Sequence, residues 1–581
     1  MNISSWAIRN PVPVVLLFMF LTLLGVMSFR RLPVQNMPEM DFPLVHITAA
    51  LEGAAPAQLE TEVARKIEDA LTSLGRLDHI ATTITNGLVG ITVQFEIGKD
   101  PEVALNEVRN AVEGVRNDLP ADMPPPGVSK QAVEDEVLVT YAVDSGKLDE
   151  TELSWLVDNE LAKSLLSAPG VGGAARVGGV DREVRVELAP SAMEALGLTA
   201  ADVSSTLRST QADFSGGRAE ISKNRQTLRT LGAVRSVEDI AALHVAGPNG
   251  VPVRLGDIAA VTDSFADRAS LARLDGRPVV AVQVRRSKGS SDLDVLAGVR
   301  AALDTFRSKN PGVTITEACT TIVPTIENYD ASLRMLHEGA LIAVVVVFVF
   351  LKSWRATLIA AAALPLSIIP AFIVMRLAGF SLNVISLLAL SLVIGVLVDD
   401  AIVEIENIAR HARLGKSPRE AADDAAREIG LAVLATTLAL VSVFLPTAFM
   451  GGIFGIVFRQ FGVTAAAAVL ASLLVARLLT PMMAARWMRP ETSPGKKDDG
   501  PLLRAYLALV QKCLARRKST LAGVAAFLAA SLSLTAFLDS AFTPPQDNSQ
   551  TTVLITLPPG SPLWKTGEAA GDAAGIIARI P

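Results

Sequence analysis

Asp399 and Asp400 are adjacent carboxylates inside the apolar run SLLALSLVIGVLVDDAIVEI, which is otherwise long enough to cross a bilayer. An ionised acid at the bilayer centre costs roughly 3 kcal/mol or more, so such residues usually face a bundle interior and handle ions or protons. Burial and a like-charged neighbour both favour the protonated carboxyl, so a proton can be taken up and released within one cycle. We therefore interpret the pair as a proton-carrying site whose charge could bias a two-state helix packing.

Neighbouring positions on a helix point about 100° apart, so the two acids can face different partners. An alternative is that one acid is buried for assembly while its twin faces a water-lined cleft without transport. Intramembrane proteolysis by paired aspartates needs acids on two facing helices, which adjacent acids on one helix do not provide.

Arg477 is a candidate counter-charge for this pair. It lies nine residues before Arg486, and Asp400 lies ten residues before Arg410, so at about 1.5 Å per residue the two have a similar depth. One hypothesis is that Arg477 pairs with the aspartates or tunes them. The alternative, which we favour, is an arginine that reaches the headgroups.

Three further acids lie near the apolar runs. Glu338 precedes the run ALIAVVVVFVF and could form a proton entrance, although an ordinary interfacial carboxylate is equally consistent with its position. Glu404 and Glu406 follow the aspartates toward the cytoplasm. They could form a proton exit or be solvated at the interface, and we favour solvation.

The elements that must position these residues are seven apolar runs of about 20 residues, the length that spans a bilayer core. With 50% hydrophobic and 19% charged residues in 581, the composition excludes an ordinary soluble enzyme. The fold class is therefore a polytopic α-helical membrane protein. The runs are residues 12–29, 333–351, 357–374, 382–403, 429–449, 461–485 and 519–538.

Positive charge gathers after the second, fourth and sixth runs, which predicts that these loops are cytoplasmic. The first run is followed by SFRRLP and no small-residue cleavage site, so we interpret it as a retained helix. Residues 33–329 then lie outside the cytoplasm. Cys319 and Cys513 fall on opposite sides of the membrane and cannot pair with each other. The charge balance indicates no nucleic-acid partner.

The large insertion alternates strand-like and helical patterns, which predicts two α+β modules of the split βαβ kind. A polar segment, DFSGGRAEISKNRQTLRTL, predicts a hairpin with Gly216 and Gly217 at its turn. The hairpin could be a solvated surface feature or an arm that docks into a neighbouring subunit.

The end of the chain resembles its beginning: a helix, a Pro-containing link, a β run, a Pro/Gly turn and a helical run. Repeats about 510 residues apart suggest a parallel duplication, as in many transporters. We expect the chain to be the first half of such a duplication, and hence truncated, split or partial.

Three motifs, GVLVDDAIVEIENIAR, RATLIAAAALPLSIIPAF and FLPTAFMGGIFGIVFRQF, closely resemble the resistance-nodulation-cell division (RND) superfamily, in its hydrophobe/amphiphile efflux branch of the acriflavine-resistance type. The likeness covers essentially the whole chain. It implies a trimeric, proton-driven pump in the inner membrane of Gram-negative bacteria that works with a periplasmic adaptor protein and an outer-membrane channel.

The resemblance also implies site roles. Asp399 and Asp400 match the aspartates that load and release protons, and a lysine from the second half would be their counter-charge. Val137 and Val177 stand at substrate-pocket positions where drug-pumping relatives often carry phenylalanine. Their smaller side chains argue against planar aromatic drugs as the preferred cargo. No cofactor, metal site or catalytic residue is expected, because the protein would be a secondary active transporter and not an enzyme.

The expected domain organisation follows the chain. It comprises a cytoplasmic start and first span (1–32), a first porter module (33–126), a second porter module (127–172 and 263–328), a docking-type subdomain with the projecting hairpin (173–262), spans two to six (329–489), a basic cytoplasmic linker or amphipathic helix (490–518), a seventh span (519–538) and the start of a third porter module (539–581).

The leading functional prediction is proton-coupled efflux of amphiphilic or hydrophobic compounds by a pump of which this chain is the N-terminal half. One alternative is a nontransporting fragment or an assembly partner that needs a second polypeptide. Another is RND export of metal ions or lipids, although the intact aspartate pair favours organic substrates.

Overall fold

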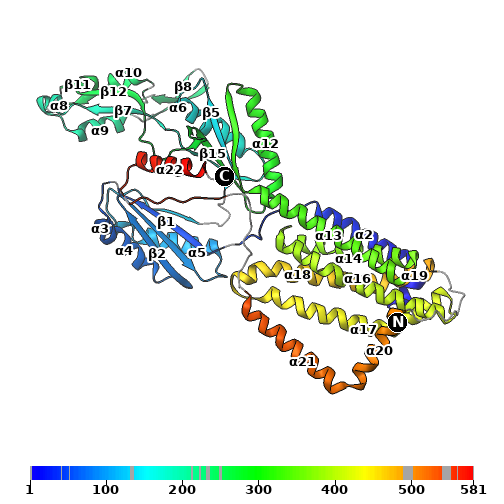
Figure 1. The fold of residues 1–581 in the computed structure, drawn as a ribbon. Coiled ribbons are helices and arrows are strands. Elements are labelled where there is room, and N and C mark those ends of the chain that lie inside the picture. Colours follow the sequence, from blue (N-terminus) through cyan, green and yellow to red (C-terminus); the bar gives the residue numbers. More distant parts are fainter. Residues whose placement is uncertain are drawn as a thin grey trace. The chain divides into compact units, whose positions relative to one another are not determined.

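The computed structural model describes residues 3–40, 42–51, 53–130, 137–210, 214–221, 224–230, 234, 236–247, 251–488, 501–538, 551–558 and 560–579. The chain forms two compact units (Figure 1). One is mainly helical and contains residues 1–32 and 327–554. The other mixes helices and strands and contains residues 33–326 and 555–581.

Among the described residues, seven helical stretches are long and apolar enough to cross a membrane, and each coincides with one predicted run. A short helix, α1 (Ile3–Arg9), precedes them. The stretches are α2 (Pro11–Phe29), α13 (Ile322–Leu351), α14 (Trp354–Ile368) with α15 (Ala371–Leu377), α16 (Val384–Arg413), α17 (Pro418–Phe444) with η6 (Leu445–Phe449), α18 (Gly452–Leu474) with η7 (Val475–Leu479) and α19 (Thr480–Trp487), and α21 (Arg517–Leu534) with η8 (Thr535–Phe537).

Helices α16 and α18 form the interior of the helical unit. More than half of the apolar stretch of each is buried, whereas that of α21 has no buried residue. Small side chains let α18 approach its neighbours closely, as is common between membrane helices. At Gly462 a Cβ would lie 2.2 Å from Oγ1 of Thr447 and 2.6 Å from the carbonyl oxygen of Phe444, so this crossing requires glycine.

The first sheet of the mixed unit has the strand order β2-β3-β1-β4, with all neighbours antiparallel. Alternate residues of β3, from Val89 to Phe95, are buried in a core with the helices, as a half-buried strand requires. The elements are β1 (Leu44–Ala50), α3 (Pro56–Leu59), η1 (Glu60–Ala64), α4 (Arg65–Leu71), β2 (Leu77–Thr85), β3 (Leu88–Phe95), α5 (Pro101–Gly114), η2 (Arg116–Asp118) and β4 (Gly127–Lys130).

The second sheet has the order β16-β5-β15-β6, again antiparallel. Its core includes Tyr141, Val282 and Leu165, all buried. The elements are β5 (Val137–Ser145), α6 (Glu150–Leu156), η4 (Val157–Leu161), α7 (Ala162–Leu166), β6 (Val171–Val177), β15 (Val280–Arg286), α12 (Asp292–Lys309) and β16 (Val313–Thr320).

The strand pairing places the boundaries of two predicted modules at other residues than the sequence did. Strand β4 pairs with β1 of the first sheet, so the first module extends through Lys130 and does not end at 126. Strand β6 pairs with β15 through Val177, so the second module passes the expected limit at 172. Both module boundaries depend on which distant segments pair as strands. The local residue pattern does not show these partners, so the sequence misplaced the boundaries.

A third region has its own small core around Met193, Leu255 and Ile258. In it β7 (Arg182–Leu188) pairs with β12 (Ala259–Phe265), and β10 (His244–Ala246) pairs with β11 (Pro252–Arg254). The helices are α8 (Pro190–Leu196), α9 (Ala200–Thr210), α10 (Val237–Ala241) and α11 (Leu255–Ile258). Two short strands, β13 (Arg273–Leu274) and β14 (Arg277–Pro278), follow.

The predicted hairpin is present as β8 (Phe214–Ile221) paired with β9 (Asn224–Thr230). Its glycines are not at the turn. Gly216 and Gly217 lie inside β8, where the register shifts between Ser215 and Gly217. Glycine within a strand commonly marks such a bulge, so the expected turn position was wrong because a bulge and a turn share this signal.

The end of the chain differs from its prediction in one of its elements. Residues 551–558, expected as a β run, form no strand, since a strand needs a hydrogen-bonding neighbour to exist. The following helical run is α22 (Leu563–Ile577), as predicted. Part of the segment expected as a basic linker or amphipathic helix forms α20 (Pro501–Ala515).

Candidate functional site

Helix α16 carries both aspartates and is anchored at its start by a buried capping box. The Asn383 side chain accepts a hydrogen bond from the Ser386 backbone N–H at 2.9 Å, and the Ser386 hydroxyl accepts one from the Asn383 N–H at 3.0 Å. Asn383 Nδ2 also donates to Oε1 of Gln460 on α18 at 2.6 Å. These bonds set the rotation and depth of α16 against α18, and therefore the direction in which its acids point.

The two aspartates have different environments. Asp399 is exposed, whereas Asp400 is partly buried and has Ser472 of α18 as a polar neighbour. The Ser472 hydroxyl also donates to the backbone oxygen of Leu397 at 3.1 Å. Asp400 therefore faces the interior contact between α16 and α18, as its position about 100° from Asp399 allows.

Glu404 is the most buried acid of α16, with no exposed surface. Solvation at the interface, the interpretation favoured from the sequence, is therefore wrong for this residue, whereas Glu406 is exposed as expected. Neither carboxylate oxygen of Glu404 has a hydrogen-bond partner among the described residues. The sequence did contain a signal: Glu404 lies four residues after Asp400 and so shares its helix face.

Arg477 lies against Glu404. Its Nη1 atom is 3.9 Å from Oε2 of Glu404 and donates to the backbone oxygen of Ala426 on α17 at 2.8 Å. The side chain is 14% exposed, so it is held inside the helical unit and does not extend into open solvent. The ion pair that the structure shows for Arg477 is thus with the acid one turn beyond the aspartates.

The remaining predicted residues lie apart from this cluster. Glu338 is exposed on α13. Val137 pairs with Arg285 and Val177 pairs with Ala281, so both flank β15 but four positions apart along it. The second sheet therefore carries both valines without making them neighbours.

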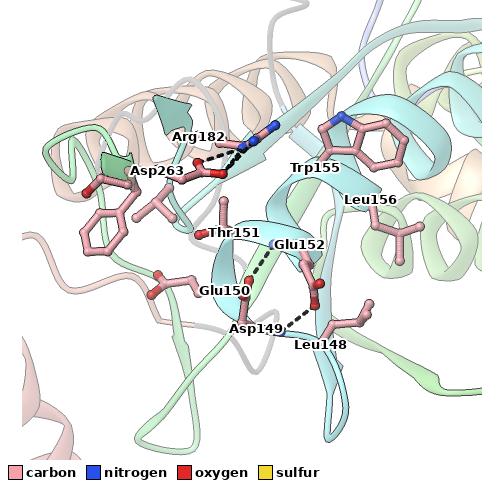
Figure 2. Close-up of a pocket in the computed structure, with 12 residues that line it drawn as sticks. Leu148, Asp149, Glu150, Thr151, Glu152, Trp155, Leu156, Arg182 and Asp263 are labelled. Atoms are coloured by element: carbon pink, nitrogen blue, oxygen red, sulfur yellow. Dashed lines mark hydrogen bonds and ion pairs between the residues drawn. The ribbon is translucent and has the colours of Figure 1, made fainter. Parts of the chain in front are cut away.

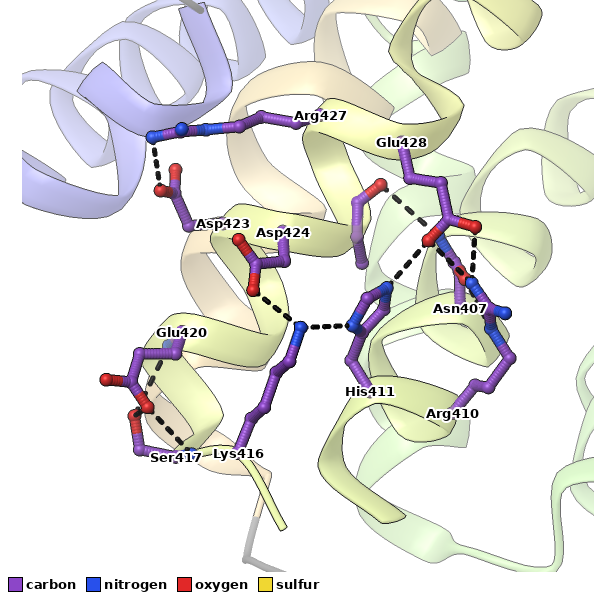
Figure 3. A network of polar contacts seen from close by, with 11 residues as sticks. Asn407, Arg410, His411, Lys416, Ser417, Glu420, Asp423, Asp424, Arg427 and Glu428 are labelled. Atoms are coloured by element: carbon purple, nitrogen blue, oxygen red, sulfur yellow. Dashed lines mark hydrogen bonds and ion pairs between the residues drawn. The ribbon is translucent and has the colours of Figure 1, made fainter. Parts of the chain in front are cut away.

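A polar network joins the end of α16 to the start of α17 (Figure 3). Lys416 donates to Nδ1 of His411 at 2.9 Å and to Asp424 at 2.7 Å. Because ammonium is only a donor, the other ring nitrogen, Nε2, is the donor to Glu428 at 2.7 Å. Arg410 also pairs with Glu428. These contacts fix the loop that connects the two helices.

The mixed unit contains an open cavity of about 900 Å³ between α6 and the β7–β12 pair (Figure 2). Trp155 and Phe265 are part of its wall and are largely exposed. Arg182 binds Asp263 there through two nitrogens, at 2.9 and 2.6 Å. Sequence reasoning missed this site, although the single tryptophan in the polar run TELSWLVDNEL was an available signal.

Comparisons with known proteins agree with the motifs and the helices. The AcrB/AcrD/AcrF family profile matches residues 3–578. Two relatives, each named multidrug resistance protein MdtC, from Salmonella schwarzengrund (strain CVM19633) and Salmonella newport (strain SL254), are 34% identical to this chain over 514 residues. The match covers 87% of this chain and 50% of each relative, so the chain spans about half their length. This chain therefore belongs to the AcrB/AcrD/AcrF family of RND efflux pumps.

Proposed function

We infer that this chain is part of a proton-driven pump that exports amphiphilic or hydrophobic compounds from the inner membrane or periplasm. The observation that carries this inference is the placement of Asp399 and Asp400 on α16, one of the two most buried apolar helices of a family member. Acids in such a helix are costly and commonly carry protons.

The geometry supports a simple coupling step. Protonation of Asp400 removes a charge from the contact between α16 and α18, whereas release of the proton restores that charge. Because α18 approaches its neighbours closely through small residues, such a change in charge favours one helix packing over another. Asp399 points in a different direction and is exposed in this chain, so it does not take part in the contact between α16 and α18.

The assembly proposed for the complete pump is a trimer with a periplasmic adaptor protein and an outer-membrane channel, of which this chain supplies the N-terminal half. The two antiparallel sheets, with helices between their strands, support split βαβ porter modules in the periplasm. The β8–β9 hairpin supports a docking arm, since it is a two-stranded sheet on its own.

The substrate side has two candidate regions. One is the second sheet with Val137 and Val177. The other is the cavity in Figure 2, whose lining includes Trp155, Phe265 and the ion-paired Arg182. Such a mixture of aromatic surface and a few polar groups fits an amphiphile.

Asp399→Asn and Asp400→Asn test the proposal in the complete gene product that contains this chain, expressed in a bacterial host without its own efflux pumps. Each variant is expected to lose drug resistance and dye efflux while its membrane level stays normal. Glu406→Gln, an exposed acid on the same helix, is the matched control. Normal efflux in both aspartate variants would refute proton coupling at this pair.

The second candidate function is a nontransporting assembly partner, and the observation behind it is the half-length match to the relatives. Expressing the 581 residues alone, and together with the remaining half of a relative, separates the two functions. Efflux when the second half is supplied supports a transporting half of a pump, whereas no efflux in either case supports the nontransporting role.

A further inference from the structure

We propose that Glu404 is a third proton-carrying carboxylate, coupled to Asp400 and opposed by Arg477 as a movable counter-charge. This inference rests on the proposed function and extends it to a residue that the aspartate motif does not include. Four features of the structure carry it: the burial of Glu404, its spacing from Asp400, the divided contacts of Arg477, and the space that Gly430 leaves for the guanidinium.

The first feature is an unsatisfied acid. Glu404 has no exposed surface, and neither of its carboxylate oxygens accepts a hydrogen bond among the described residues. A buried ionised carboxylate needs a close cation and hydrogen bonds, whereas a protonated one is neutral. The burial of Glu404 and its lack of hydrogen bonds therefore favour the protonated form of this acid.

The second feature is proximity to the proposed proton site. Glu404 follows Asp400 by four residues on α16, about 6 Å along the helix axis and on the same face. The charges that act on Glu404 are those of Arg477 and Asp400. On α17, the charged residues near Ala426 are engaged elsewhere: Arg427 with Asp423, and Glu428 with Arg410 and His411. A negative charge on Asp400 therefore disfavours one on Glu404, and a proton on one of these acids favours ionisation of the other.

The third feature is that Arg477 contacts the Ala426 carbonyl and also lies within ion-pair distance of Glu404. Its Nη1 donates to the Ala426 carbonyl at 2.8 Å, while Oε2 of Glu404 is 3.9 Å away, beyond the distance of about 2.7–2.9 Å of a charge-assisted hydrogen bond. A shift of about 1 Å toward Glu404 would close the ion pair when the acid loses its proton. Arg477 can thus link the protonation state of α16 to the packing of α17.

The fourth feature is a site shaped around the guanidinium. Arg477 lies in the π-helical turn η7, in which the Thr480 N–H bonds to the Val475 carbonyl. Pro481 follows, and it has no N–H to donate to the Arg477 carbonyl four residues earlier. On the other side, a Cβ at Gly430 of α17 would lie 2.7 Å from Nη2 of Arg477. Single π turns are common at functional sites, and glycine inside a helix is unfavourable, so both features indicate a built pocket.

The test compares Glu404→Gln, which mimics the protonated acid, with the exposed control Glu406→Gln, in the complete gene product and in a pump-deficient host. We expect Glu404→Gln to lower the efflux rate by about tenfold or more, the scale of a lost proton-transfer group, and to flatten its dependence on pH. Membrane level and melting temperature are measured for each variant. Glu404→Gln with the efflux rate and pH profile of the control would overturn the proposal.

The double variant Glu404→Gln/Arg477→Gln distinguishes a proton-carrying Glu404 from one that only forms a structural ion pair. If the pair only holds helices together, removing both charges restores efflux, because no buried charge is left alone. We expect the double variant to recover membrane level but not the pH-dependent efflux. Full recovery of efflux would overturn the proposal.

Gly430→Ala is a third variant that tests Arg477 without removing a charge. The added methyl displaces the guanidinium, while alanine favours the helix. We expect a lower efflux rate with an unchanged or higher melting temperature. The outcome of Asp400→Asn keeps the two proposals distinct: if Asp400→Asn abolishes efflux and Glu404→Gln does not change it, only the role of Glu404 fails.

Discussion

Among single residues, the first three carboxylates of α16 become more buried along the helix, from exposed Asp399 through partly buried Asp400 to fully buried Glu404, while Glu406 is exposed again. The gradient arises because one face of α16 packs against α17, α18 and η7. An acid on that face is covered by neighbouring helices, whereas Asp399 and Glu406 on other faces are exposed in this chain. The acids in the motif VDDAIVEIEN therefore differ in exposure because they lie on different faces of α16, although all of them are carboxylates.

A residue-level prediction concerns the Arg182–Asp263 pair at the cavity in the mixed unit. Hydrogen bonds from Arg182 lower the pKa of Asp263 below its usual range. Because the folded-state pKa is the lower one, the pair's stabilisation is complete above the unfolded pKa of about 3.9 and is lost as pH falls through the folded pKa. We expect Asp263→Asn to lower the melting temperature at pH 7, with the difference from the unchanged protein shrinking in acid.

The matched control is Asp267→Asn. Asp267 is fully exposed and lies 3.6 Å from Arg185, a looser contact than the two-nitrogen pair at Asp263. Its melting temperature is expected to change less at pH 7. The prediction would be contradicted if the difference in melting temperature between Asp263→Asn and the unchanged protein grew as pH falls.

At the scale of elements, α16 is held by polar contacts at both ends. Its start is tied to α18 through Asn383 and Gln460, and its end to α17 through His411 and Glu428. Between these anchors the contacts are mainly apolar, apart from those of Asp400 and Glu404 and the hydrogen bonds of Ser472 with Leu397 and of Asn407 with Ala425. This arrangement leaves the middle of the helix as the part whose packing can respond to charge.

The element-level prediction compares two helix caps. Ser417→Ala removes the exposed capping box of α17 and should cost about 1 kcal/mol of unfolding free energy. Asn383→Ala removes a cap and also the donor to buried Gln460, which should add about 1–3 kcal/mol. Denaturant titration of the purified protein in detergent measures both. Equal losses would show that the Gln460 contact contributes nothing.

At the scale of the whole molecule, the positive-charge pattern predicts which side of the membrane each segment occupies. Cys319 on β16 and Cys513 on α20 are both exposed and unpaired with each other. We expect a membrane-impermeant thiol reagent to label Cys319 in spheroplasts and Cys513 only after the membrane is opened. Single serine variants at each position identify the labelled residue. Labelling of Cys513 in intact spheroplasts would contradict the predicted topology.

Several features of the fold could be predicted from the sequence because local pattern determines them. Apolar length located all seven candidate spans, and hydrophobic periodicity predicted the alternation of strands and helices in the large insertion, since these signals reside in consecutive residues. The limits of the modules could not be predicted this way. Strands β4 and β6 join sheets through partners far along the chain, and the bulge at Gly216 and Gly217 resembles a turn in sequence.

Residue pattern was sufficient to predict two acids within an apolar helix and an arginine at a similar depth. The pattern did not identify Glu404 as the buried acid beside Arg477. Burial depends on which face of α16 meets α17 and η7, and on a π turn and a glycine that make room for a guanidinium. Spacing along one helix fixes a face, but the neighbouring helices decide what that face contacts.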